Sequence, residues 1–354
     1  MFNIDRLELA RKRRRYTAKV LAEHAGIAPV TYSRIVNRQQ APDDATIVAL
    51  VDALGYPREF FEQDDFDPID KSAASFRSLT GMTARERDAA LAAGSLAFEV
   101  MDWVQSRFTL PEPDILDLGH ERSPAAAARM LRQHWAMGEK PVGHMIKLLE
   151  SKGVRVFSLA EDTKNVDAFS CWRGSEPFVF LNTYKSSERS RFDAAHELGH
   201  LVLHRHGAPQ GREAEAEANT FASAFLMPQA DLLSTIPYVS SVDQIVRAKK
   251  RWGVAAVALA YRLNKLGLMT EWQYIQVNRQ YRSAEPQGID PERSVVWQMV
   301  LTDLWKDGLS RSHIAKELLI PDGELESLLF GLVGTNEAPA RQKPVLRSVN
   351  GFKD

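Results

Sequence analysis

The sequence is poor in cysteine and in long apolar runs, and each shortage excludes a class of protein. Cys171 is the only cysteine among 354 residues, so no internal disulfide can form and a reducing cytoplasm is the expected compartment. No stretch reaches the roughly 18 uninterrupted apolar residues that a membrane-spanning helix needs. Asp5, Arg6 and Glu8 interrupt any apolar start that a signal peptide would require. These shortages predict a cytoplasmic protein without a membrane partner.

The chain also lacks an overall excess of charge of either sign. Its 45 Lys and Arg residues nearly balance 46 Asp and Glu residues, and the formal net charge is -1. This balance argues against a uniformly basic coat for nucleic acid. Residues 1–40, however, hold nine Lys or Arg against three Asp or Glu, a local excess of six. That excess suits an anionic partner for the N-terminal part of the chain.

The most informative stretch is HELGH at residues 196–200, an instance of H-E-x-x-H. On a helix, His196 and His200 lie one above the other on a single face, where one metal ion can take both imidazoles. Glu197 can reach a water on that metal without ligating it, so it is placed as a general base. The alternative is a surface helix that carries two histidines by chance. The acidic, Ala-rich run at residues 213–222 favours the metal site, because it can supply a third ligand.

The N-terminal residues have the pattern of several short helices. Thr17 is the expected N-cap of a helix at residues 18–25, and Gly26 breaks that helix as a helix-turn-helix requires. Pro29 stands in the first turn of the next helix. Together with VTYSRI at residues 30–35, these features resemble the XRE (Cro/repressor-type) helix-turn-helix family.

The XRE resemblance implies a five-helix-type domain whose third helix enters the major groove of double-stranded operator DNA. One departure is Ala18, where the family usually has a Gln that contacts the DNA backbone. The resemblance places Val30, Thr31 and Arg34 on base edges, and Arg38, Gln39 and the basic run at residues 11–15 on phosphates. The alternative is a helical dimerisation module with a solvated basic face.

The residues around HELGH carry a second resemblance. They include PFVFLN at 177–182, Arg189, RF at 191–192, AHELGH at 195–200, LH at 203–204, residues 215–222 and LMP at 226–228. This combination resembles the ImmA/IrrE family of zinc metallopeptidases, strongly over 177–228 and loosely from 120 to 265. The resemblance implies a zincin-like, gluzincin-type fold and an intracellular endopeptidase that clips transcriptional repressors or antitoxins.

The third metal ligand needs a choice within the acidic run. Gluzincin-like sites place the ligand Glu four residues before an Asp or Asn that supports a zinc histidine. Glu215 and Asn219 fit that pattern on one helix face, so we expect Glu215 as ligand and Asn219 as a residue that supports a zinc-binding histidine. Glu217 points about 200° away around the helix and is the lesser alternative. The expected metal is one Zn²⁺ per chain, with Mn²⁺ as the alternative in vivo.

Other parts of the site are expected nearby. In zinc peptidases an edge strand beside the metal commonly holds the substrate backbone by strand addition. Our candidate for that strand comprises Phe178, Val179, Phe180, Leu181 and Asn182. The alternative is an ordinary core strand. His204 is expected to be a packed or capping residue. The residues within reach as general acid or oxyanion stabiliser are Tyr184, Arg189 and His206.

The predicted fold class is mostly α with a small β-sheet (α+β). The expected parts are a helix-turn-helix domain at 1–66, a linker and long helix at 67–118, a metallopeptidase domain at 119–270 and a helical region at 271–354. Residues 296–331 have the rhythm of a second helix-turn-helix. Glu324 and Glu326 would repel phosphate there, so a protein-contact module is an equal alternative.

Two functions follow from these features. The first is a DNA-binding zinc endopeptidase that regulates transcription by cleaving a repressor or antitoxin, in a stress, mobile-element or toxin–antitoxin setting. The second is a non-proteolytic XRE-family regulator or antitoxin that uses the zincin fold as a sensor or partner-binding scaffold. The intact His196, Glu197, His200 and Glu215 favour the first, because a scaffold needs no base. An XRE-type domain also often implies a homodimer.

Overall fold

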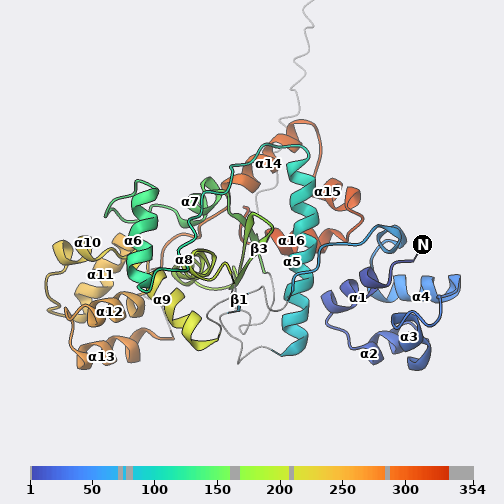
Figure 1. Ribbon diagram of the computed structural model, residues 1–354, viewed down its shortest axis with the longest axis horizontal. Coiled ribbons are helices and arrows are strands. Elements are labelled where there is room, and N and C mark those ends of the chain that lie inside the picture. Colours follow the sequence, from blue (N-terminus) through green and yellow to red (C-terminus); the bar gives the residue numbers. More distant parts are fainter. Residues whose placement is uncertain are drawn as a thin grey trace, which may run out of the picture.

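In the computed structural model, the described residues are 2–70, 75–76, 83–159, 168–206, 211–283 and 288–334. They form a mostly helical protein with one four-stranded mixed sheet, so the predicted α+β class is confirmed. The N-terminal helices lie at one end and a long helix, α5, separates them from the sheet (Figure 1). Among the described residues, none of the helices combines the length and the apolar character needed to cross a membrane.

The N-terminal helices start where the sequence supplies capping side chains. The Thr17 hydroxyl accepts a hydrogen bond from the backbone N–H of Val20, and Asn3 and Asp43 cap the first and fourth helices. Gly55 ends the fourth helix at a φ of 67°, a left-handed conformation that favours glycine. The elements are α1 (Ile4–Arg13), α2 (Ala18–His24), α3 (Pro29–Val36), α4 (Asp44–Leu54) and the 3-10 helix η1 (Arg58–Glu62).

The long helix α5 (Ala84–Gln105) packs on both the N-terminal helices and the sheet. Its sheet-facing side contains Gly94, where a Cβ atom would lie 3.3 Å from the rings of Phe169 and Phe180. One helical turn further on, the ring of Phe98 lies 4.6 Å from that of Phe178. Gly94 therefore lets α5 approach the sheet closely. Helix α5 lies between the N-terminal helices and the sheet.

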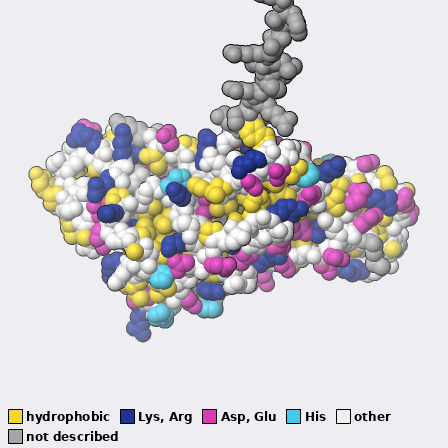
Figure 2. Space-filling model, turned by 90° about the horizontal axis from the view of Figure 1, so that it is seen from above, with side chains coloured by type: hydrophobic (Ala, Val, Ile, Leu, Met, Phe, Trp, Pro, Cys, Tyr) yellow, Lys and Arg dark blue, Asp and Glu magenta, His cyan; other side chains and the backbone are white. Residues whose placement is uncertain are grey.

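Helices surround the rest of the sheet. Those on the side away from the N-terminal domain in Figure 1 lie between residues 124 and 281. On the face shown in Figure 2, acidic and basic side chains are interspersed rather than separated by sign. The helices are α6 (Pro124–His134), α7 (Met145–Ser151), α8 (Ser187–Leu203), α9 (Arg212–Leu226), α10 (Gln229–Thr235), α11 (Val242–Trp252), α12 (Ala256–Lys265) and α13 (Glu271–Tyr281).

The sheet places its strands in the order β1-β3-β4-β2. Strand β4 pairs antiparallel with β3 on one side and parallel with β2 on the other. The strands are β1 (Ser75–Phe76), β2 (Arg155–Ser158), β3 (Ala168–Arg173) and β4 (Glu176–Leu181).

This order corrects the predicted substrate strand. Both edges of β4 are engaged within the sheet, so the prediction that residues 178–182 form an edge strand is wrong and the core-strand alternative holds. All five side chains are buried: Phe178, Val179, Phe180, Leu181 and Asn182. A continuous apolar run of this kind is typical of a strand covered on both faces.

The C-terminal helices return to the first half of the chain. Trp297 donates its indole N–H to the backbone carbonyl of Val156 in β2, and Trp103 of α5 donates to the carboxylate of Glu317. Helix α16 packs on both α5 and β2. The second helix-turn-helix-like region thus packs on other parts of this chain, and its role stays a prediction. Its helices are α14 (Val295–Lys306), α15 (Arg311–Glu317) and α16 (Asp322–Leu329).

Glu324 of α16 joins the C-terminal helices to the N-terminal domain. Its carboxylate pairs with Arg13 at 2.8 Å and Arg14 at 3.1 Å, and accepts a hydrogen bond from the Tyr56 hydroxyl at 2.9 Å. Burial raises the pKa of Glu324, but the charges and hydrogen bonds of these partners lower it by more. The carboxylate therefore stays ionised inside this interface.

These contacts correct the expectation for the basic run at residues 11–15. Arg13 is buried and also donates to the carbonyl of Ala89. Arg11 pairs with Glu8. Most of the run therefore forms ion pairs within the chain. The XRE resemblance implied that the run contacts phosphates, but Arg13 is not available for such contacts.

We predict that Glu324→Gln destabilises the interface. The substitution keeps the side-chain size but leaves the buried Arg13 guanidinium without its anionic partner, which costs roughly 3–5 kcal/mol in buried pairs. The first unfolding transition in urea should shift to lower denaturant. Glu326→Gln is the matched control, because Glu326 is exposed on the same helix. Equal midpoints for the two variants would contradict the assigned role.

The same pair predicts a pH dependence. The folded-state pKa of Glu324 is lowered, so its stabilisation is present above the unfolded pKa of about 4.3 and is lost as pH falls through the folded pKa. The difference in urea midpoint between the wild type and Glu324→Gln should therefore shrink as pH falls below about 4.3. A constant difference between them down to low pH would show that the charge of Glu324 is not what stabilises the interface.

Candidate metal centre

The H-E-x-x-H sequence lies on α8, between the sheet and α9. Residues 193–203 are all buried, and α8 packs against α9, β3 and β4. A surface helix that carried two histidines by chance would expose them to solvent. His196 is fully buried and His200 is 5% exposed. The surface-helix alternative is therefore wrong.

Helices α8 and α9 approach each other at a glycine. A Cβ atom at Gly199 would lie 3.2 Å from the Cα atom of Ala218 and 3.1 Å from the ring of Phe221. Both distances are shorter than ordinary van der Waals contact, so a larger side chain would force the helices apart. Gly199 lies next to His200 in the sequence, and this close approach brings α9 within reach of both histidines.

Three side chains converge between the two helices. The Nε2 atoms of His196 and His200 lie 3.1 Å apart, and the two oxygens of Glu215 lie 3.2 Å and 3.3 Å from them. Burial raises the pKa of Glu215, but its contacts with the two imidazole rings outweigh this effect and lower the pKa to about 2. The predicted trio thus forms a compact cluster with an ionised carboxylate.

This donor set fits a zinc ion. One ligand atom from each residue can be chosen so that all three lie within 4.8 Å of one another. Two imidazoles and one carboxylate form a common protein donor set for catalytic zinc, which keeps a fourth position for water or substrate. Two imidazoles and a carboxylate face one another in a largely buried space, and such an arrangement is costly without a compensating charge. The chemistry of the cluster therefore favours a cation between them.

Asn219 lies where the i, i+4 spacing predicted. Its side-chain oxygen lies 3.2 Å from Nδ1 of His196. An amide oxygen can only accept, so it fixes the proton of His196 on Nδ1. Nε2, the atom that faces Glu215, is then left unprotonated and available to a metal.

His204 and Glu217 complete an equivalent arrangement for His200. Nδ1 of His204 lies 2.9 Å from Nδ1 of His200, and its Nε2 lies 2.9 Å from a carboxylate oxygen of Glu217. Burial lowers the pKa of His204 and favours its neutral form. A neutral His204 that donates to Glu217 must accept from Nδ1–H of His200, which leaves Nε2 of His200 free of a proton. Glu217 thus acts on the ring of His204 and lies outside the ligand cluster.

Glu197 is held by a residue that the sequence did not reveal. The hydroxyl of Ser170 in β3 donates to a carboxylate oxygen of Glu197 at 2.7 Å, and Glu197 is fully buried. This contact orients the carboxylate beside the cluster. A polar residue inside the otherwise apolar run of β3 was the signal that could have indicated it.

Cys171 follows Ser170 in the sequence but has a different chemistry. Burial raises the pKa of its thiol, and the negative charge of Glu197 raises it further. The thiol therefore stays protonated at neutral pH, when a reactive cysteine would be a thiolate.

The three expected general acids or oxyanion stabilisers have other partners. Tyr184 is exposed and stacks on Phe330 at 4.5 Å. Arg189 donates to the carbonyl of Arg282, and His206 lies 2.8 Å from Asp117. These contacts do not include the metal-cluster residues, and a role as general acid or oxyanion stabiliser stays a prediction for all three.

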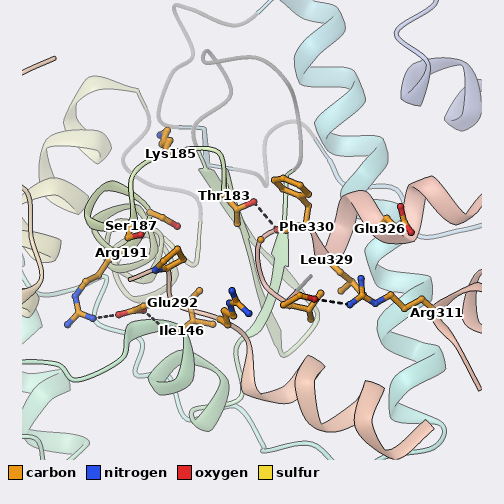
Figure 3. Close-up of a pocket in the computed structure, with 16 residues that line it drawn as sticks. Ile146, Thr183, Lys185, Ser187, Arg191, Glu292, Arg311, Glu326, Leu329 and Phe330 are labelled. Atoms are coloured by element: carbon orange, nitrogen blue, oxygen red, sulfur yellow. Dashed lines mark hydrogen bonds and ion pairs between the residues drawn. The ribbon is translucent and has the colours of Figure 1, made fainter. Parts of the chain in front are cut away.

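A separate pocket lies at the N-terminal end of α8. It has a volume of about 450 Å³ and lies between α8, the segment at 291–293 and the C-terminal helices (Figure 3). Thr183 donates to the carbonyl of Phe330 on one wall, and Arg191 pairs with Glu292 on another. The pocket lining includes none of the metal-cluster residues. The pocket belongs to the junction of α8 with the C-terminal helices.

The residues predicted to contact DNA lie on α3 and the turn after it. Val30 is 62% exposed, Arg34 and Gln39 are exposed, and Thr31 is half-buried. Arg38 is exposed and pairs with Asp5 at 2.7 Å. Val30 and Arg34 share one helix face, opposite the buried side chains that anchor α3. This exposed face has the geometry that a helix needs to enter a groove.

Comparisons with known families agree with both halves of the chain. Residues 7–61 match the family model described as helix-turn-helix. Residues 149–264 match the peptidase family model described as the IrrE N-terminal-like domain, and this segment contains both α8 and α9. The chain thus joins an XRE-type helix-turn-helix domain to an IrrE-like peptidase domain. No match to the chain was found among curated proteins.

We predict different metal affinities for three glutamate variants of α9. Glu215→Ala removes a direct ligand and should abolish stoichiometric zinc binding, measured by equilibrium dialysis and elemental analysis. Glu217→Ala leaves the ligands in place but releases His204, so affinity should fall about 10- to 100-fold. Glu213→Ala, an exposed change on the same helix, should bind as the wild type does. Full zinc binding by Glu215→Ala would refute the ligand assignment.

Proposed function

We propose that this chain is a DNA-binding regulatory zinc endopeptidase of the cytoplasm. It cleaves a protein partner, a transcriptional repressor or an antitoxin, and thereby controls transcription in a stress, mobile-element or toxin–antitoxin setting. The helix-turn-helix domain at 1–66 selects double-stranded operator DNA, and the peptidase domain at 119–270 carries out the cleavage. The XRE-type domain favours a homodimer on that DNA.

One observation carries the proposal. The histidines of α8 and Glu215 of α9 converge within reach of one ion, and Glu197 is buried beside them on the hydroxyl of Ser170. A cluster that served only to stabilise the fold would have no use for an oriented carboxylate next to it. The combination of three ligands with a held base is the requirement for hydrolysis of an amide.

The metal and the side chains of the protein contribute different parts of the chemistry. Zinc held by His196, His200 and Glu215, or manganese in its place, supplies Lewis acidity that lowers the pKa of water and polarises a peptide carbonyl. Glu197 accepts the proton of the attacking water and later donates it to the leaving amine. The hydroxyl of Ser170 holds one carboxylate oxygen of Glu197 in place for both transfers.

The surrounding residues hold the ligands in the required state. Asn219 keeps the proton of His196 on Nδ1, and the His204–Glu217 pair does the same for His200. His196 and His200 are themselves buried, which limits the access of bulk water to these hydrogen bonds. Such outer partners raise the basicity of the imidazoles and fix their orientation.

A non-proteolytic regulator is the second candidate. In that case the zincin fold serves as a sensor or a partner-binding scaffold, and the helix-turn-helix domain alone acts on transcription. The intact metal cluster would suit this role equally well. The position of Glu197 favours the peptidase, because a scaffold gains nothing from a buried, oriented base.

We predict that Glu197→Gln keeps zinc and loses cleavage. Glutamine has the same shape as glutamate but cannot accept the proton of water, so the metal ligands stay intact while hydrolysis stops. Zinc content per chain and cleavage of the protein encoded by the neighbouring gene, with and without a chelator, are the two measurements. Glu213→Gln is the matched control. Cleavage by Glu197→Gln at the wild-type rate would refute the assigned base, and a wild type without chelator-sensitive cleavage would favour the scaffold.

We predict that Arg34→Ala weakens DNA binding about 10- to 100-fold. Loss of one base-edge contact costs about 1–3 kcal/mol and should relax sequence preference at one position. Fluorescence anisotropy with duplexes selected from a random pool by the wild type measures both effects. Lys306→Ala removes an exposed positive charge outside the helix-turn-helix domain and should bind as the wild type does. Equal affinity of Arg34→Ala and wild type would remove α3 as the reading helix.

A further inference from the structure

The strand beside the catalytic base already has an extended segment on its outer edge. Strand β3 pairs with β4 on one edge and with β1 on the other. Strand β1 consists of Ser75 and Phe76, from the chain between η1 and α5. It runs antiparallel to β3, with Ser75 opposite Ser170 and Phe76 opposite Phe169. A segment from the linker thus extends the sheet of the peptidase domain.

The register places β1 next to the site. Ser170 is the residue whose hydroxyl holds the carboxylate of Glu197. The backbone of Ser75 therefore pairs with the residue that orients the proposed base. An extended peptide that adds to a sheet edge is held mainly by its main chain, with little demand on its sequence. The outer edge of β3 is thus a place where a substrate backbone would lie beside Glu197.

The other end of the sheet does not offer an equivalent edge. On the far side of β2, the indole N–H of Trp297 donates to the backbone carbonyl of Val156 at 3.2 Å. The ring of Trp297 also lies 5.4 Å from that of Phe157. Helix α14 thus covers β2. Strand β4 is interior, and the outer edge of β3 is paired with the two residues of β1.

We propose that β1 is an internal pseudosubstrate. In the resting chain Ser75 and Phe76 occupy the β3 edge where the extended backbone of a protein substrate must bind, and that substrate has to displace them. This inference rests on the proposed peptidase function and names its regulation.

The contacts near β1 suit a reversible occupant. A two-residue strand contributes few ladder hydrogen bonds, and short strands are marginal by themselves. The preceding linker is held to the end of β3 by Arg173, which pairs with Asp67 at 2.6 Å and with Asp102 of α5 at 2.6 Å. The carboxylates of Asp67 and Asp102 are both exposed, so solvent screens these pairs. Separation of Ser75 and Phe76 from β3 therefore breaks few ladder hydrogen bonds.

The test compares proline with alanine at the same positions in the full-length chain. Ser75→Pro/Phe76→Pro removes both backbone N–H groups and prevents strand pairing. Ser75→Ala/Phe76→Ala keeps those groups and is the matched control. The binding probe is a fluorescein-labelled synthetic peptide with the sequence of residues 70–79, added to metal-free protein and followed by anisotropy. The activity probe is unfolded casein with zinc-loaded protein, with and without a chelator.

The proline variant should bind the peptide at least about tenfold more tightly than the wild type, because the competing segment no longer masks the edge. The alanine variant should behave as the wild type does. Hydrogen exchange of residues 168–173 should be faster in the proline variant and slow again when the peptide is added. Circular dichroism verifies that both variants keep the helical content of the wild type.

The two arms separate this inference from the proposed function. Equal peptide affinity in all three proteins, or unchanged exchange in β3, would overturn the pseudosubstrate. Tighter peptide binding by the proline variant without chelator-sensitive casein cleavage in any protein would support the pseudosubstrate and count against the peptidase. If the proline variant binds the peptide more tightly and is also the one protein with faster chelator-sensitive cleavage, the result supports both the pseudosubstrate and the peptidase.

Discussion

The close packing of α8 on α9 is the contact on which the candidate site depends. Gly199 allows it, because a side chain there would collide with the backbone of Ala218 and the ring of Phe221. The same approach brings Glu215 to both histidines and Asn219 to the outer nitrogen of His196. One backbone constraint therefore sets both the ligand cluster and the hydrogen bond that prepares one of its ligands.

Buried polar contacts with several segments fix the position of α8. Glu188 in its first turn pairs with Lys249 of α11 at 3.0 Å, and both side chains are almost fully buried. Arg191 binds the carbonyls of Val142 and Trp252 and the carboxylate of Glu292. Further along the chain, Glu324 ties the C-terminal helices to the DNA-binding domain. Charge contacts of low solvent exposure thus join the metal helix to Glu292, and others join the helix-turn-helix domain to Glu324, both in the C-terminal part of the chain.

The sequence was most informative where partners share a helix. The i, i+4 spacings of His196 with His200, and of Glu215 with Asn219, predicted their common faces because helical geometry alone sets them. It was least informative where partners lie on different elements. The contact of Ser170 with Glu197, the His204–Glu217 pair and the burial of Arg13 by Glu324 depend on tertiary packing that no local pattern encodes. The unbroken apolar run of β4 indicated a strand that is buried on both faces. Its interior position in the sheet, however, depends on which strands pair with its two edges.

The most direct test of the central claim is anomalous diffraction at the zinc edge from crystals of the full-length chain soaked in zinc. The account predicts one strong peak per chain between α8 and α9, about 2.0–2.2 Å from Nε2 of His196, Nε2 of His200 and an oxygen of Glu215. Glu197 should lie beside the peak and outside bonding distance. A zinc-saturated crystal without a peak at this place, or with Glu197 as a direct ligand, would contradict it.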